Sequence, residues 1–170
     1  AKGNVDTGLG KDVAYGTIGI IAPTVLVTQP EQKMDIDGVG FVFHNAPGAE
    51  CPAEMTFSIP EKRLYDGAEN LSQQMHNLLP VRGAKVRDAL RWSNYMDHAL
   101  EQVREADIYI ASHNWPEWGN ANIKTLITMH RDVYKYTHDQ TVRLINAGYT
   151  IKEIPDMVKL PKSLSEYFGA

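Results

Sequence analysis

Before residue 118 the chain alternates short runs of β-branched and aromatic residues with turn residues, a pattern typical of a β-sheet. The clearest pair of strands meets at Asp37-Gly38, where alternating polar and apolar positions on both sides predict a hairpin. The predicted strands are residues 13–22, 25–28, 33–37, 39–43, 53–59, 63–68 and 107–111. Residues 83–104 predict a helix, because apolar side chains recur there at spacings of three and four. Strands, a helix and a further strand together indicate a layered α/β unit.

The rest of the chain has a helical pattern. Asn120 is a suitable N-cap for a helix that runs to about Ala147, and Gly148 is a suitable residue to end it. This helix is longer than a compact α/β domain usually needs, which favours an arm that packs on another part of the protein. Residues 150–153 form a capping box for a further helix, which Pro155 would keep short or kinked.

Composition and charge exclude several classes of protein. The 170 residues are 43% hydrophobic and 22% charged, which is typical of one globular domain and unlike a disordered chain. The net charge of −4 provides no basic excess for nucleic acid or for an anionic membrane surface. The single cysteine, Cys51, cannot form an intrachain disulfide, so a disulfide-stapled scaffold is excluded. The longest apolar run, residues 18–22, is far too short to span a membrane.

Side chains able to bind a metal follow predicted strands in three places. Glu50 and Glu54 lie in one loop, Glu69 follows a later strand, and His113 follows residues 107–111. Strand ends are rigid and adjacent, so these groups can converge, and carboxylates with imidazoles suit zinc. Taken alone this pattern is a weak indication, because solvated loop carboxylates and a capping histidine would produce it too.

Six sequence segments, in a fixed order, strengthen the metal hypothesis. They are Asn45-Ala-Pro-Gly-Ala-Glu-Cys-Pro-Ala-Glu-Met, Ala68-Glu-Asn, His76-Asn-Leu, Arg82-Gly-Ala-Lys-Val-Arg-Asp-Ala, Ser112-His-Asn-Trp-Pro and Tyr134-Lys-Tyr-Thr-His-Asp-Gln-Thr-Val-Arg-Leu. Over nearly the whole chain they closely resemble the zinc-dependent alkylsulfatases of the metallo-β-lactamase superfamily, which hydrolyse dodecyl sulfate. The resemblance implies an α/β fold: residues 1–117 as the second half of a metallo-β-lactamase αββα sandwich, and residues 118–170 as the first helices of an α-helical dimerisation domain.

The resemblance also implies a site for two zinc ions. Glu50 and His113 would each bind one metal, and Glu69 would bridge the pair, since two nearby cations need shared negative charge. Glu54 stays an alternative first ligand, although Glu50 is preferred because it lies next to a Pro-Gly turn. Cys51 is interpreted as a small buried filler rather than as a ligand.

Sulfate recognition is expected from Arg82, Arg87 and Tyr15, with Arg82 and Glu69 as the catalytic pair. Guanidinium groups match a tetrahedral oxyanion bidentately, and the start of the predicted helix adds a favourable dipole. Ordinary surface charge at a helix start is the alternative for both arginines, and His76 is either a group that supports the site or a packing residue. The implied reaction is attack by metal-activated water on an alkyl sulfate, yielding alcohol and sulfate.

The superfamily's first metal motif, His-x-His-x-Asp-His, does not occur in the sequence. The histidines are His44, His76, His98, His113, His130 and His138, and no two of them are two positions apart. We therefore expect activity only together with the missing N-terminal half of the catalytic domain, in a homodimer formed through the helical region. The alternatives are a truncated, non-catalytic oligomerisation module and a hydrolase for another ester. The compartment is left open, although the resemblance includes exported members, periplasmic or secreted.

Overall fold

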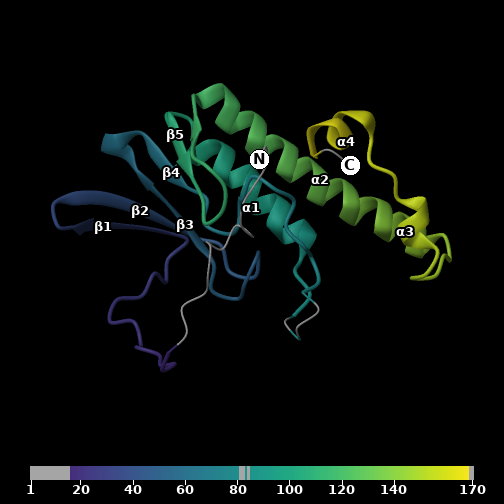
Figure 1. Ribbon diagram of the computed structural model, residues 1–170, viewed down its shortest axis with the longest axis horizontal. Helices are drawn as coiled ribbons and strands as arrows, with labels where there is room; N and C mark the ends of the chain where they lie inside the picture. The colour runs from purple at the N-terminus through teal and green to yellow at the C-terminus, as the bar shows by residue number, and fades with distance from the viewer. Residues whose placement is uncertain (1–15, 81–82, 84, 169–170) are drawn as a thin grey trace.

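The computed structural model describes residues 16–80, 83 and 85–168. Figure 1 shows a sheet on one side and two long helices packed beside it. The strands are β1 (Glu31–Ile36), β2 (Val39–Asn45), β3 (Met55–Ile59), β4 (Leu64–Asp66), β5 (Ile108–Ile110) and β6 (Glu117–Trp118). The α-helices are α1 (Ala89–Gln102), α2 (Asn120–Asn146), α3 (Ile154–Met157) and α4 (Lys162–Phe168). Strand order follows chain order, and every neighbouring pair is antiparallel except β4 and β5.

The predicted hairpin at Asp37-Gly38 is confirmed as the connection between β1 and β2. Both turn residues have positive φ, 52° and 80°, as a tight two-residue hairpin turn requires. The side chain of Asp35 accepts a hydrogen bond from the amide of Gly38 at 3.0 Å, which closes the turn. The second predicted pair is also confirmed, as β3 and β4 joined by a short 3₁₀ helix over Pro60–Lys62.

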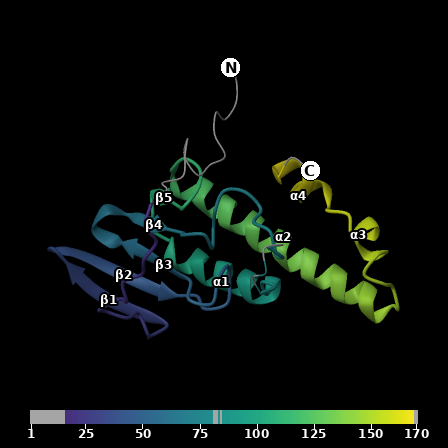
Figure 2. The ribbon, with the colours of Figure 1, turned by 60° about the horizontal axis from the view of Figure 1, so that its bottom comes forward.

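The core lies between one face of the sheet and the two long helices. Trp92 and Met96 of α1 and Ile123 and Ile127 of α2 are fully buried in it. Helix α2 packs along α1 and then extends beyond the sheet toward α3 and α4 (Figures 1 and 2). One core thus continues across residue 118, and the division of the chain into two domains stays a prediction.

The two faces of the sheet differ because side chains alternate along each strand. His44 and Tyr65 point to one face and are buried there. Phe41, Phe43 and Phe57 gather on the other face, with ring centroids between 5.5 and 5.8 Å apart. Phe41 and Phe57 remain partly exposed, so this second face is apolar and only partly covered.

Three predicted elements differ from the structure. None of the described residues 16–28 lies in a strand, so the predicted strands at 13–22 and 25–28 are wrong where the structure describes them; residues 13–15 lie outside it. Ile18 and Ile20 are more than nine-tenths exposed, because β-branched composition makes a strand only where another strand pairs with it. The helix predicted from residue 83 begins at Ala89, since Asp88 caps it by accepting a hydrogen bond from the Arg91 amide.

The long helix matches its prediction closely. It spans Asn120–Asn146, and Gly148 follows it with a φ of 88°. Asn120, however, is its first helical residue, and its side chain donates hydrogen bonds to the carbonyl oxygens of Val103 and Ala106 at 2.7 and 2.8 Å. These bonds fix the start of α2 to the end of α1.

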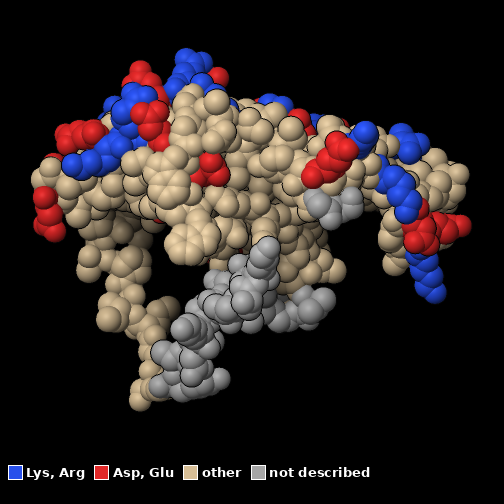
Figure 3. All heavy atoms as spheres, turned by 45° about the horizontal axis from the view of Figure 1, so that its top comes forward, with Lys and Arg blue, Asp and Glu red and all other residues tan. Residues whose placement is uncertain are grey.

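Charged side chains on the face drawn in Figure 3 lie mostly toward its periphery, with basic and acidic groups interspersed. The middle of that face is largely uncharged. Among the helices that the structure describes, none combines the length and the hydropathy needed to cross a membrane.

Candidate metal centre

Glu69 and His113 meet at the end of two parallel strands. Asp66 of β4 and Ile110 of β5 are register partners, and each of the two candidate ligands follows its strand by three residues. Oε1 of Glu69 lies 2.7 Å from Nε2 of His113. The predicted convergence of these groups is therefore present, and it follows from the parallel pairing.

A tight turn after β4 directs Glu69 to this position. The Gly67 amide donates to the Ile110 carbonyl at 2.8 Å, and the Ala68 amide donates to the Asp66 side chain at 2.7 Å. A Cβ at position 67 would collide with the Tyr109 hydroxyl, so the chain can pass here only as glycine. The turn thus depends on Gly67 for its close approach to β5.

His76 is a further member of the site. Its Nε2 lies 3.1 Å from Oε2 of Glu69, so the Glu69 carboxylate stands between the imidazoles of His76 and His113. Sequence reasoning left the role of His76 open, because residues 67–80 form no helix or strand whose periodicity could place it. Its occurrence in the segment His76-Asn-Leu was the one available signal.

Glu50 lies close to this group. One ligand atom each from Glu50, Glu69 and His76 lie within 4.8 Å of one another, a spacing that a metal ion could bridge. The loop that carries Glu50 is held by hydrogen bonds from Ala46 to Glu54 and from Gly48 to Cys51, at 2.8 and 2.9 Å. Carboxylate oxygens with an imidazole nitrogen form a donor set suited to zinc.

Glu54 and Cys51 lie beside Glu50, and ligand atoms of these three residues also lie within 4.8 Å of one another. Glu54 is buried, and its Oε1 accepts a hydrogen bond from the Met55 amide at 2.9 Å. Burial, followed by the charges of Glu50 and Glu69, raises the pKa of Glu54. Burial likewise raises the pKa of the Cys51 thiol, which disfavours the thiolate needed for metal binding.

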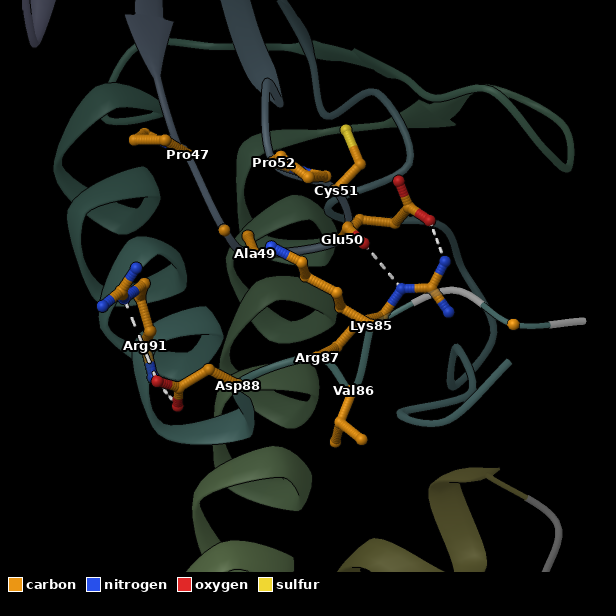
Figure 4. Close-up of a pocket in the computed structure, with 12 residues that line it drawn as sticks. Pro47, Ala49, Glu50, Cys51, Pro52, Lys85, Val86, Arg87, Asp88 and Arg91 are labelled. Carbon is orange, nitrogen blue, oxygen red and sulfur yellow. Dashed lines mark hydrogen bonds and ion pairs between the residues drawn. The ribbon is translucent and has the colours of Figure 1, made fainter. Parts of the chain in front are cut away.

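Arg87 pairs with Glu50 in a buried ion pair, drawn with dashed lines in Figure 4. Its Nε donates to the backbone carbonyl of Glu50 at 2.6 Å, and its terminal nitrogens contact the Glu50 carboxylate and Asn77. The side chains are only 5% and 13% exposed. The guanidinium of Arg87 therefore faces acceptors of the protein itself, directly beside a candidate metal ligand.

A cavity of about 900 Å³ opens between the Glu50 loop and the start of α1 (Figure 4). Three basic side chains, Lys85, Arg87 and Arg91, line it together with Val86 and nearby prolines. Arg91 lies 3.9 Å from the Asp88 carboxylate. Glu50 and Asp88 also line the cavity and pair with Arg87 and Arg91, so it combines charged groups of both signs with apolar walls.

Two predicted sulfate ligands, Arg82 and Tyr15, lie outside the described residues. Of the residues singled out from the sequence, the structure brings together Glu50, Glu69, His113 and Arg87. His130 lies in the core, where Nδ1 is 2.9 Å from the Leu126 carbonyl oxygen.

Known alkylsulfatases are similar to this chain along nearly all of its length. It is 43% identical over 166 residues to an alkyl/aryl-sulfatase of Saccharomyces cerevisiae. The aligned region covers 97% of this chain and 26% of that relative. It is 41% identical over 170 residues to a linear primary-alkylsulfatase of Pseudomonas sp., covering 99% of the chain and 25% of the relative. The chain therefore spans about a quarter of the length of these curated relatives. No protein-family model matches it.

Solved structures give the same picture. The stereoselective inverting sec-alkylsulfatase Pisa1 from Pseudomonas sp. superimposes with a TM-score of 0.85 at 37% identity, over 88% of this chain and 24% of that one. A metallo-β-lactamase, DIM-1, reaches a TM-score of 0.50 at 16% identity, over 64% of this chain and 46% of its own, a likeness of fold alone. These relatives confirm the predicted α/β fold class.

Proposed function

We propose that this chain, which is similar to known alkylsulfatases along nearly all of its length, is part of an alkylsulfatase of the metallo-β-lactamase superfamily, an enzyme that hydrolyses alkyl sulfates to alcohol and sulfate. The observation that carries the proposal is the position of the Glu69 carboxylate between His76 and His113, close to Glu50. These groups come from three separate loops, and packing a core would not require them to converge.

The residues present fit a zinc centre by their chemistry. Glu50 and His113 would each hold one ion, and Glu69 would bridge the two; its Oε1 contacts His113 and its Oε2 contacts His76. When bound, zinc supplies a Lewis acid and lowers the pKa of water. His76 would orient the Glu69 carboxylate through its 3.1 Å contact, as groups behind metal ligands commonly do.

Sulfate would be held by basic side chains that precede α1 in the sequence. We assign this role to Arg82 and Arg87 and place Tyr15 at the substrate, with Arg82 and Glu69 as the catalytic pair. Support comes from the cavity beside Glu50, where Lys85, Arg87 and Arg91 lie next to apolar walls, with Glu50 and Asp88 as the ion-pair partners of the two arginines. An alkyl sulfate has the complementary character, an anionic head on an apolar chain.

The site needs residues beyond these 170. The metal-capable groups among the described residues offer three ligands each, whereas a dinuclear centre needs more donors. The partly exposed apolar face of the sheet, with Phe41 and Phe57, also calls for a covering layer. Both features support a requirement for the N-terminal half of the catalytic domain.

The helical region, residues 118–170, is proposed as the start of a dimerisation domain. Helix α2 extends beyond the sheet (Figure 2), and apolar side chains near its far end are substantially exposed. They are Val142, Ile145, Tyr149, Ile151 and Met157. The same exposure favours the second candidate function, a non-catalytic oligomerisation module. A stable zinc-free dimer whose size is unchanged by chelators, with no turnover in any context, would favour that module.

The decisive experiment inserts this chain into the Pseudomonas linear primary-alkylsulfatase in place of the matching segment. The product is called the exchanged enzyme. We expect the exchanged enzyme to bind zinc and to hydrolyse dodecyl sulfate, and the same exchange with Glu69→Gln to lose turnover. The isolated chain is assayed in parallel for zinc content and turnover, and we expect no turnover. Two tightly bound zinc ions with full turnover in the isolated chain would refute the need for the missing half. An exchanged enzyme that folds and binds zinc but cleaves no alkyl sulfate would refute the activity.

A further inference from the structure

We propose that Trp92 of α1 and Tyr134 of α2 are positioning residues, which together hold the backbone on both sides of the Glu69–His76 loop so that these two side chains meet. That the contact between Glu69 and His76 serves metal binding rests on the function proposed above. That Trp92 and Tyr134 hold the loop in place does not rest on it. The proposal assigns a task to two buried aromatic residues.

Tyr134 holds the His76 end of the loop. Its hydroxyl accepts a hydrogen bond from the His76 amide at 2.8 Å and donates one to the His76 carbonyl at 3.3 Å. The ring is 1% exposed, and burial raises the pKa of Tyr134 far above its ordinary value, so the hydroxyl remains protonated. One side chain therefore satisfies both backbone groups of His76.

Trp92 holds the other end of the loop. Its Nε1 donates a hydrogen bond of 2.7 Å to the carbonyl of Asn70, the residue after Glu69. Trp92 is fully buried, and its ring stacks on Tyr134 with centroids 4.7 Å apart and an interplanar angle of 13°. The His76 ring lies 5.6 Å from Trp92, so the stack also contacts the imidazole it helps to place.

Residues 67–80 form no helix or strand, so no ladder of hydrogen bonds fixes them. The stacked pair restricts the rotation of both rings, which makes its two polar atoms rigid anchor points. Because Tyr134 belongs to α2, the long helix is tied directly to the backbone of a residue that contacts Glu69. A displacement of α2 would accordingly move His76.

The test compares Tyr134→Phe with Tyr136→Phe in the full chain. Tyr136 is a matched control, since its hydroxyl also donates to a backbone carbonyl, that of Lys159 at 2.8 Å, from the same helix. Two readouts apply to the metal-free protein: hydrogen exchange of the His76 amide, and the ¹⁵N signals of the His76 ring, which report its contact with Glu69. For Tyr134→Phe we expect exchange to accelerate by roughly tenfold or more and the ring signals to shift. For Tyr136→Phe we expect neither change.

A cobalt titration of the exchanged enzyme, in which this chain replaces the matching segment of the Pseudomonas alkylsulfatase, tests the consequence for metal binding by visible absorption. Tyr134→Phe should weaken Co²⁺ binding by about tenfold to a hundredfold, as loss of groups behind metal ligands does. Trp92→Phe retains a ring but not the Nε1 donor, and we expect faster exchange across the loop with the fold preserved. Unchanged exchange and unchanged ring signals in Tyr134→Phe would overturn the positioning role. If the exchanged enzyme that carries the unaltered chain binds no cobalt while the exchange and ring signals change as expected, the positioning role stands and the proposed metal centre is contradicted.

Discussion

Glu69 and His113 are 44 positions apart in the chain, and their side chains approach to 2.7 Å. The approach follows because β4 and β5 are neighbouring parallel strands, so their carboxyl ends lie at the same end of the sheet. His76 completes the arrangement on the other oxygen of the same carboxylate, at 3.1 Å. The carboxylate is thus the shared element of the site, and its replacement is the most direct test.

We expect Glu69→Gln to weaken zinc binding by at least about tenfold, because a neutral amide cannot neutralise two cations or offer two equivalent oxygens. The affinity is measured by competition with a chromophoric chelator. Glu61→Gln is the control, since Glu61 is exposed in the short 3₁₀ helix and its replacement changes the net charge equally. Equal zinc affinities in the two variants would show that Glu69 does not bind the metal.

Glu50 and Glu54 can be distinguished as first ligands by parallel replacements. Glu54 is buried and accepts a hydrogen bond from the Met55 amide, a bond that a glutamine can preserve. We expect Glu50→Gln to weaken zinc binding by about tenfold or more, and Glu54→Gln to change it by less than about threefold. The reverse order in the same chelator assay would identify Glu54 as the ligand.

Removal of Arg87 should destabilise the metal-free protein strongly. Arg87→Met leaves the Glu50 carboxylate buried without its partner, a change that typically costs about 3–5 kcal/mol of unfolding free energy. Arg63→Met is the comparison, because Arg63 forms an exposed ion pair with Asp107 that we expect to contribute far less. Urea denaturation at neutral pH measures the unfolding free energy of both variants. Decreases of similar size would show that burial of the Arg87–Glu50 pair does not increase its contribution to stability.

Stability should fall as the pH is lowered from about 7 toward 5. Burial lowers the pKa of His130 below its ordinary value near 6.5, so the native state binds fewer protons than the unfolded chain in this range. Its stabilising contribution is present above the unfolded pKa and is lost as the pH falls through the folded one. Burial lowers the pKa of His44 as well, so the two groups act in the same direction.

The corresponding test follows urea denaturation of His130→Leu across this pH range. We expect a shallower decline in unfolding free energy than in the unaltered protein, with the remaining slope coming in part from His44. His98→Leu, which removes an exposed histidine from α1, is the control for the substitution. An identical slope in His130→Leu and the unaltered protein would contradict the lowered pKa.

The parts of the fold that sequence patterns predicted are those fixed by local rules. The Asp37-Gly38 turn and the periodicity of α2 depend on neighbouring residues alone, and both are confirmed. The strand expected over residues 13–22 failed in its described part, since a strand requires a partner that no local pattern supplies. The two-residue β6 is too short to leave a periodic signal.

The same distinction applies to the candidate site, where some residues could be predicted from the sequence and some contacts could not. Glu50, Glu69 and His113 were identifiable because they follow strands and occur in segments that resemble a known family. The contact of His76 with Glu69 was not predictable, since it depends on an irregular loop anchored by side chains from distant helices. Nor was the pairing of Arg87 with Glu50, which results from how α1 meets the Glu50 loop.

The Arg87–Glu50 pair changes how metal uptake should be understood. Arg87 pairs with the Glu50 carboxylate, so a metal ion that binds Glu50 would compete with a guanidinium for this carboxylate. Arginine does not deprotonate in proteins, so the metal would compete with a fixed internal charge, and because the pair is buried this competition would depend little on salt. The displaced guanidinium would then be free to receive an anion beside the newly bound metal.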